Sequence, residues 1–261
     1  MEALKVDYRQ MGAMLPPPVD ATENIRSALL RPLPEFQPAL FPHDGTIIVC
    51  GSGPSCPSFI EDIRAERGKR RPIWAVKGAH DLLCKSGIEP DAFVSCEAKP
   101  RLENVQQRND HTVYFLSSRC SPELYDWLER KKIIQWHPFV ETGTMPELSG
   151  KQLIGGGTTS GLRAVTLAYL LGFSKFILYG FDSCLDLTTK KKRYDSGAMP
   201  RELTVDRILN GRRFLCNGAM AMQADEFQEY YKLFPDITFE AKGDGLIAAI
   251  IADRKRRGLR A

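Results

Sequence analysis

The stretch Gly155–Asp182, GGGTTSGLRAVTLAYLLGFSKFILYGFD, decides the fold that the sequence predicts. Three glycines and three hydroxyl residues open it, and from Leu162 apolar residues recur with helical spacing until Gly172. The apolar run Phe176–Tyr179 then predicts a short buried strand, which Gly180 ends. A glycine-rich turn at the start of a helix offers unpaired backbone N–H groups and the positive end of the helix dipole, which suit a phosphate. A helix cap without a ligand explains the same turn equally well.

Upstream of this stretch, short apolar runs alternate with helical segments from residue 46 onward. We expect strands there at Thr46–Cys50, Ile73–Val76, Asp91–Cys96, Val113–Leu116 and Ile133–Trp136. Strands that are apolar throughout and alternate with helices are typical of a parallel sheet covered on both faces. Because crossovers between parallel strands are right-handed, the sequence predicts an α/β fold: a Rossmann-like, doubly wound, mostly parallel sheet with helices on both faces.

The sequence predicts a single domain over residues 45–253, preceded by a proline-rich N-terminal arm, residues 1–44. Pro16–Pro18 form a stiff extended piece in this arm. A short helix is expected next at Ala21–Leu30, with Thr22 as its cap. We expect the arm to lie across the domain or across a neighbouring subunit, which makes a homodimer plausible.

Downstream of the opening stretch the chain changes character. Residues 186–201, DLTTKKKRYDSGAMPR, are polar and basic, and the segment is long for a connection in a compact domain. We expect a lid over a bound donor, with Lys190–Arg193 meeting phosphates; a disordered connection without a role is the alternative. A hairpin is expected around Asn210-Gly211. The basic tail, residues 254–261, is expected to be frayed and solvated.

Composition and charge are evidence against a membrane-spanning protein, a secreted protein and a zinc protein. The 261 residues carry a net charge of +4, which by itself indicates no particular partner. No apolar run reaches the roughly 18 residues that a membrane-spanning helix needs. The first residues lack the apolar segment of a signal peptide, so we expect a cytoplasmic protein. The seven cysteines form no C-x-x-C pair and the histidines lack ligand spacing, so a zinc site is not expected.

Polar loops follow most of the expected strands, at the edge where ligands bind in doubly wound sheets. These loops are Gly51–Ser55, Lys77–His80, Glu97–Lys99, Ser117–Arg119, Gly155–Gly161 and Asp182–Ser183. A purely structural sheet would not need so many polar loops at one edge. The sequence therefore predicts a binding site there.

Two glycine–hydroxyl turns are the candidate nucleotide-binding elements. They comprise Gly51, Ser52, Gly53, Pro54 and Ser55 in the first turn, and Gly156, Gly157, Thr158, Thr159, Ser160 and Gly161 in the second. Neither turn matches G-x-G-x-x-G, and the chain contains no G-x-x-x-x-G-K-[ST] loop, so P-loop kinase chemistry is excluded. We expect Gly53 and Gly161 to let a ligand approach the backbone closely, because glycine has no side chain.

Acidic and basic side chains at the same edge are the candidates for chemistry. Asp182 and Glu97 follow buried strands, where carboxylates can hold Mg²⁺ against phosphates or act as a general base. The alternative is that each caps a neighbouring helix or pairs with Lys99 or Arg119. The candidate phosphate or acceptor contacts are Lys77, His80, Lys99, Arg119, Asn217 and Gln223.

The segments IIVCGSGPS (47–55), WAVKGAHDLLCKSGIEPDAFVSCE (74–97) and IGGGTTSG (154–161) together resemble the 6-hydroxymethylpterin diphosphokinase (MptE-like) family, over roughly residues 46–250. The frame also resembles that of bacterial sialyltransferases, whose T-S-G motif is matched at 159–161. Three departures from the diphosphokinase pattern stand out. They are Ser52 and Lys77 in place of asparagines and Glu97 in place of an aspartate. No histidine follows Asp182, although the sialyltransferases have a catalytic one.

The resemblance implies a transferase that moves a diphosphoryl group from a nucleoside triphosphate to a hydroxyl acceptor. Because Asp182 and Glu97 could hold Mg²⁺, this ion is the expected cofactor. The sialyltransferase-like frame implies an alternative, glycosyl transfer from a nucleotide sugar. A nucleotide-binding protein that has lost the chemistry is a third interpretation, which the missing histidine and the Ser52 and Lys77 replacements favour. The expected partners are thus a nucleotide or nucleotide-sugar donor and a small-molecule, glycan or nucleic-acid acceptor.

Overall fold

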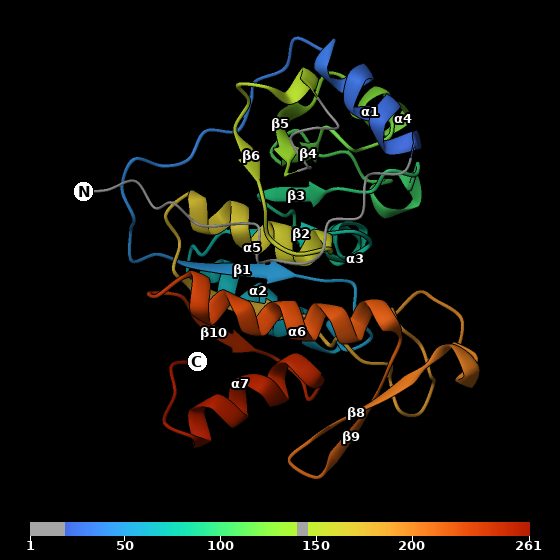
Figure 1. Cartoon of the computed structure of the whole chain (residues 1–261), viewed down its shortest axis with the longest axis vertical. Coiled ribbons are helices and arrows are strands. Elements are labelled where there is room, and N and C mark those ends of the chain that lie inside the picture. Colours follow the sequence, from blue (N-terminus) through green and yellow to red (C-terminus); the bar gives the residue numbers. More distant parts are fainter. Residues whose placement is uncertain (1–18, 140–145) are drawn as a thin grey trace.

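A parallel sheet crosses the molecule in the order β10-β7-β1-β2-β3-β4-β5-β6 (Figure 1). The computed structural model describes residues 19–139 and 146–261, so Pro16–Pro18 of the expected arm lie outside the described residues. The strands of this sheet are β1 (Thr46–Cys50), β2 (Ile73–Val76), β3 (Ala92–Ser95), β4 (Val113–Ser117), β5 (Lys132–Pro138), β6 (Leu153–Ile154), β7 (Lys175–Tyr179) and β10 (Thr238–Ala241). Every pairing between them is parallel.

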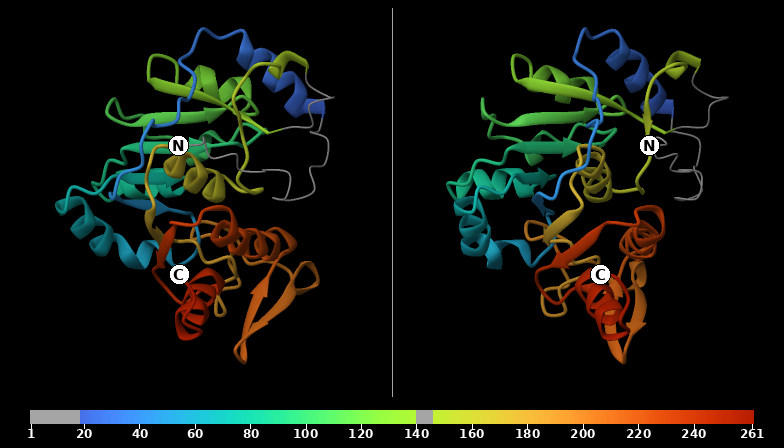
Figure 2. Two further views of the ribbon diagram at one scale, coloured as in Figure 1. Left: turned by 60° about the vertical axis from the view of Figure 1, so that its left-hand side comes forward. Right: turned by 90° about the vertical axis from the view of Figure 1, so that its left-hand side faces the viewer.

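Helices cover both faces of this sheet (Figure 2). They are α1 (Val19–Leu29), α2 (Ile60–Gly68), α3 (Ala79–Lys85), α4 (Pro122–Trp127), α5 (Ser160–Leu170), α6 (Gly218–Leu233) and α7 (Leu246–Arg256). Alternate residues of a strand point to opposite faces. Ile47 and Val49 of β1 accordingly pack in the core with α5, α6 and α7, whereas Ile48 and Cys50 pack with α2 and α3. The doubly wound α/β fold is confirmed.

Strand order reverses at β1, which makes this strand the centre of the fold. From β1 the chain proceeds through β2, β3, β4, β5 and β6 in one direction, and then returns through α5 to β7 on the other side of β1. Cys50 and Tyr179 are partners at the carboxyl ends of β1 and β7. The loops that leave these two ends therefore start side by side, and ligands bind at such a switch point in open α/β sheets.

The segment before β1 lies across the β5 side of the domain. The Phe36 N–H donates to the Gln135 carbonyl at 2.7 Å, the Gln135 N–H donates to the Pro34 carbonyl at 2.8 Å, and Phe36 is buried in the core. The expected helix is present as α1, but its cap was wrong. Thr22 lies inside α1, which already begins at Val19.

Two further differences from the sequence-based expectation lie after β5. Strand β6 has two residues, too few to give a periodic signal in the sequence. The basic tail is not frayed, because the Arg254 Nε donates to the Arg260 carbonyl at 2.7 Å and the Arg254 guanidinium lies 3.7 Å from the Tyr231 ring. The end of the chain thus folds back onto α6.

The expected hairpin is present and stands off from the sheet beyond α6 (Figure 1). Strands β8 (Val205–Leu209) and β9 (Arg212–Cys216) pair antiparallel. Asn210 and Gly211 between them both have positive φ, 53° and 75°, as a tight hairpin turn requires. In the described residues, no helix is long and apolar enough to cross a membrane.

Candidate functional site

A cleft of about 370 Å³ opens at the carboxyl ends of β1, β2, β3 and β7, next to the first residues of α5 and α6. We call it the switch-point cleft. The residues proposed from the sequence that line it are Gly51, Ser52, Gly53, Lys77, Glu97, Thr159, Gly161, Asp182, Asn217 and Gln223. The structure therefore brings together both acidic candidates and parts of both glycine–hydroxyl turns.

Other candidates do not line this cleft: Pro54, Ser55, Gly156, Gly157, Thr158, Ser160, His80, Lys99 and Arg119. His80 is wholly buried and packs against the rings of Phe93 and Tyr114, 5.3 and 6.0 Å between centroids. The His80 side chain thus packs in the core between α3 and the sheet. From this position it cannot contact an acceptor in the cleft directly.

Glycines allow the loops after β1 and β7 to pack directly on one another. A Cβ added to Gly53 would lie 2.3 Å from Asp182 Oδ2 and 2.5 Å from the Gly180 carbonyl, and one added to Gly51 would lie 2.6 Å from that carbonyl. The Gly53 N–H already donates to the Gly180 carbonyl at 3.0 Å. Gly53 is thus required for contact between the loops, not only for the approach of a ligand that the sequence suggested.

Asp182 joins these two loops. Its Oδ2 accepts a hydrogen bond from the Ser55 N–H at 3.0 Å, and its carbonyl accepts one from Leu246 N at 2.7 Å. Only 6% of the residue is exposed. Burial raises the pKa of the Asp182 carboxyl above its ordinary value, against the opposing effect of the Ser55 hydrogen bond. A carboxylate with a raised pKa is a stronger base than an ordinary aspartate.

Glu97 has the opposite electrostatic character. Its Oε1 lies 2.8 Å from Lys77 Nζ, in a half-buried ion pair across the carboxyl ends of β3 and β2. Burial acts to raise the pKa of Glu97, but the charge and hydrogen bond of Lys77 outweigh it and hold the pKa below the ordinary value. Lys77 itself has a left-handed backbone, φ 53°, which is uncommon for a residue with a side chain. Glu97 therefore pairs with a cation, but its partner is Lys77 and not Lys99 or Arg119, which the sequence suggested.

The glycine–threonine turn before α5 is satisfied largely from within the protein. Glu226 of α6 places its Oε2 3.0 Å from Thr158 N and 2.9 Å from Thr158 Oγ1, both of which donate to it. Thr159 caps α5, because its Oγ1 accepts from Leu162 N at 3.3 Å. An internal carboxylate thus takes the anion position at Thr158, and only Thr159 and Gly161 of this turn remain at the cleft.

The first turn of α6 forms the facing wall. Asn217 caps the helix through its Oδ1, which accepts from Met220 N at 2.8 Å. Gln223 donates through Nε2 to Thr159 Oγ1 at 3.1 Å and accepts at Oε1 from Ser183 Oγ at 3.0 Å. Gln223 therefore connects α6, α5 and the loop after β7. Two helix N-termini, each with a partial positive charge, meet at this wall.

Two polar cleft residues, Arg101 and Asn104, were not proposed from the sequence. Arg101 and Asn104 come from the connection between β3 and β4, which contains only the short 3₁₀ helix Leu102–Asn104 and no recognisable motif. Lys192 and Arg193 come from the expected lid, residues 186–201. Both belong to the basic run Lys190–Arg193, which the sequence analysis expected to meet phosphates.

Within the described ranges, no group of three or more His, Cys, Asp or Glu side chains could hold a metal ion. The cleft does offer the carboxylates of Asp182 and Glu97, and Mg²⁺ is commonly bound by one or two carboxylates together with substrate phosphates. Because Lys77 already neutralises Glu97, Asp182 fits a phosphate-borne Mg²⁺ better than Glu97 does.

Comparison with known proteins identifies the family of the chain. The family model described as 6-hydroxymethylpterin diphosphokinase MptE-like matches residues 20–187, more than half of the chain. No curated protein sequence matches it. Among solved structures, the MAf glycosyltransferase from Magnetospirillum magneticum AMB-1 has a similar fold, with a TM-score of 0.67 and 18% sequence identity. The match covers 87% of this chain and 36% of that one, so the chain spans about a third of that protein's length. The family match over this length shows that the chain belongs to the 6-hydroxymethylpterin diphosphokinase MptE-like family.

Proposed function

We propose that the protein is a transferase that moves a diphosphoryl group from a nucleoside triphosphate to a hydroxyl acceptor in the switch-point cleft. Family membership supports a transferase in general. The observation that carries the proposal is the set of cationic groups around the strand switch. Lys77, Arg101, Lys192 and Arg193 line the cleft beside the N-termini of α5 and α6. Three of these side chains also form ion pairs: Lys77 with Glu97, Arg101 with Glu103 and Arg193 with Asp195. Phosphoryl transfer depends mainly on such positioning and charge stabilisation.

In this reaction the acceptor oxygen forms a bond to the β-phosphorus and the bond from that phosphorus to the α-phosphate oxygen breaks. The products are the acceptor diphosphate and a nucleoside monophosphate, and the hydroxyl proton passes to a base. We assign that role to Asp182, because its raised pKa suits a general base better than the lowered pKa of Glu97. The Glu97–Lys77 pair is then an orienting element.

We propose that Mg²⁺ enters the cleft bound to the phosphates of the donor. It would supply charge neutralisation of the triphosphate, with Asp182 as the nearby carboxylate. The proposal rests on the residues that line the cleft.

Glycosyl transfer from a nucleotide sugar is the second candidate function. Its support is the fold shared with a protein described as a glycosyltransferase. The same cleft would hold the nucleotide part of that donor. The lack of any histidine after Asp182 removes the residue on which sialyl transfer is expected to depend.

Product analysis by ³¹P NMR distinguishes these functions. The protein is incubated with Mg²⁺, each nucleoside triphosphate and 6-hydroxymethylpterin, and separately with nucleotide sugars and glycan acceptors. We expect nucleoside monophosphate and an acceptor diphosphate in equal amounts. Release of the nucleotide from a nucleotide sugar would instead show glycosyl transfer. Binding without any product would show that the protein keeps the cleft and has lost the chemistry.

The expected lid provides a separate prediction. Residues 186–201 reach across the cleft, because Tyr194 Oη donates to the Gly78 carbonyl at 2.6 Å and Lys192 and Arg193 line the cleft. Saturating nucleotide should slow tryptic cleavage within this segment about tenfold at ten times Kd, because bound phosphates hold it closed. Cleavage in the tail, residues 254–261, is the internal control. Equal rates with and without nucleotide would leave 186–201 a connection without this role.

A further inference from the structure

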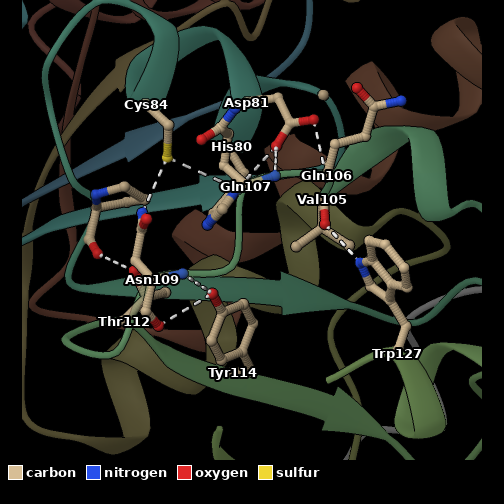
Figure 3. A network of polar contacts seen from close by, with 12 residues as sticks. His80, Asp81, Cys84, Val105, Gln106, Gln107, Asn109, Thr112, Tyr114 and Trp127 are labelled. Atoms are coloured by element: carbon tan, nitrogen blue, oxygen red, sulfur yellow. Dashed lines mark hydrogen bonds and ion pairs between the residues drawn. The ribbon is translucent and has the colours of Figure 1, made fainter. Parts of the chain in front are cut away.

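The connection between β3 and β4 is irregular but firmly held at its middle. Asp81 of α3 accepts hydrogen bonds from two consecutive backbone N–H groups, Gln106 N at 2.8 Å and Gln107 N at 3.1 Å (Figure 3). Next to them, the Val105 carbonyl accepts from Trp127 Nε1 at 2.9 Å. Three successive residues of a segment with little secondary structure are thus fixed by side chains from α3 and α4.

The contacts continue on both sides of Asp81. The Asn109 N–H donates to Tyr114 Oη at 2.9 Å and Asn109 Nδ2 donates to Cys84 Sγ at 3.1 Å (Figure 3). His80 Nδ1 lies 3.2 Å from Asp81 Oδ1. Burial, which leaves Asp81 3% exposed, opposes its ionisation, yet the hydrogen bonds from His80, Gln107 and Gln106 hold its pKa below the ordinary value. Asp81 is therefore a buried anion dedicated to this segment.

The segment that Asp81 holds presents Asn104 to the cleft. Asn104 lines the cleft and is only 4% exposed, yet its Oδ1 is buried without a hydrogen-bond partner among the described residues. A Cβ added to Gly78 would lie 3.7 Å from this oxygen, 3.0 Å from Tyr194 Oη and 3.4 Å from Asp195 Oδ2. The oxygen therefore lies at the carboxyl end of β2, next to residues 194 and 195 of the expected lid. An unsatisfied buried acceptor is costly, so a ligand N–H or O–H that completes it would be bound selectively.

We propose that Asn104 recognises the base of the donor nucleotide, and that Asp81 is the positioning residue that holds Asn104 in place. The inference rests on the proposed function. The donor's phosphates occupy the strand switch, where the glycine turn after β1 and the N-termini of α5 and α6 meet. A nucleotide extending from there across the end of β2 carries its base toward Asn104, whose Oδ1 accepts an N–H of the base edge.

The test compares affinities for the four nucleoside triphosphates and for inorganic triphosphate, measured by calorimetry on wild type and Asn104→Ala. We expect the wild type to prefer one base, and the variant to lose about tenfold in affinity for that nucleotide, the value of one hydrogen bond to a buried acceptor. Affinity for inorganic triphosphate should not change. Gln106→Ala is the matched control, because this exposed side chain does not line the cleft and its N–H to Asp81 is retained.

Asp81→Asn tests the positioning role separately. It keeps the shape of the side chain and removes the charge, so we expect a several-fold loss of base preference with unchanged affinity for inorganic triphosphate. A merely structural role would leave the ratio between nucleotides unaltered.

Three results would overturn the inference: equal affinity of the wild type for all four bases, unchanged preference in Asn104→Ala, or an effect of that variant only on the KM of the acceptor. The last result would place Asn104 on the acceptor side. Failure of the wild type to bind any nucleotide would instead overturn the proposed function itself.

Discussion

Asp182→Asn is expected to lower turnover by at least ~100-fold while the protein stays folded. Asparagine keeps the shape and can still accept the hydrogen bond from Ser55 N, so the two loops stay joined. It cannot take a proton from the acceptor hydroxyl or carry a charge beside Mg²⁺. Steady-state kcat from the ³¹P product assay, with circular dichroism as the check on folding, measures the effect.

Glu97→Gln is the matched control for this prediction. Glutamine also removes a carboxylate from the cleft, but one that Lys77 already neutralises, so the loss of turnover should be smaller. The dependence of donor binding on Mg²⁺ should weaken in Asp182→Asn and persist in Glu97→Gln. Wild-type turnover in Asp182→Asn would show that Asp182 serves only to cap the turn that contains Ser55.

Asp182→Asn is also expected to change how the stability of the folded protein depends on pH. The folded-state pKa of Asp182 is raised, so the folded protein binds the proton more tightly than the unfolded chain. The protonated Asp182 carboxyl therefore stabilises the folded protein fully below the ordinary aspartate pKa, about 4. This stabilisation is lost as pH rises through the raised folded-state pKa. The loss is about 1.4 kcal/mol per pH unit between these two values. Urea unfolding across this range should show a smaller decline in Asp182→Asn than in wild type. Parallel curves would contradict this.

Gly53→Val is expected to destabilise the protein by about 3 kcal/mol or more. The added Cβ would lie 2.3 Å from Asp182 Oδ2 and 2.5 Å from the Gly180 carbonyl, and a backbone atom cannot move aside cheaply. Gly197→Val is the matched control, because a Cβ at Gly197 meets nothing within 4 Å. The free energy of unfolding in urea, compared between the two variants, measures the difference. Equal free energies would mean that the loops after β1 and β7 do not need this close contact.

The fold was predictable because its signals are local. Each apolar run such as Thr46–Cys50 or Ile73–Val76 is a buried parallel strand, and their alternation with helices determines the architecture. The hairpin was predictable from Asn210-Gly211 alone, since both residues take the positive φ that these residue types tolerate. Strand β6, at Leu153–Ile154, was not predictable, because two residues give no periodicity.

The site was predictable in position but only partly in its members. Asp182 and Gly53 reach the cleft because they follow buried strands at the switch point. Thr158 does not, because Glu226, 68 residues later in the chain, already accepts its hydrogen bonds. Asn104 was missed because the connection that carries it has no motif. The contacts that hold this connection come from Asp81, which lies 25 residues before Gln106 in the chain and accepts hydrogen bonds from Gln106 N and Gln107 N.

The most direct test of the central claim, that a nucleotide donor binds in the switch-point cleft, is hydrogen–deuterium exchange with and without a nucleoside triphosphate and Mg²⁺. Calorimetry first establishes a saturating concentration. Protection is expected in the peptides that contain Gly51–Gly53, Thr159–Gly161 and Asn217–Gln223, because each of these ranges includes residues that line the cleft. Protection confined to a different cavity would contradict the claim that the donor binds in the switch-point cleft. One such cavity, lined by Arg64, Asp91 and His111, lies at the amino ends of the strands.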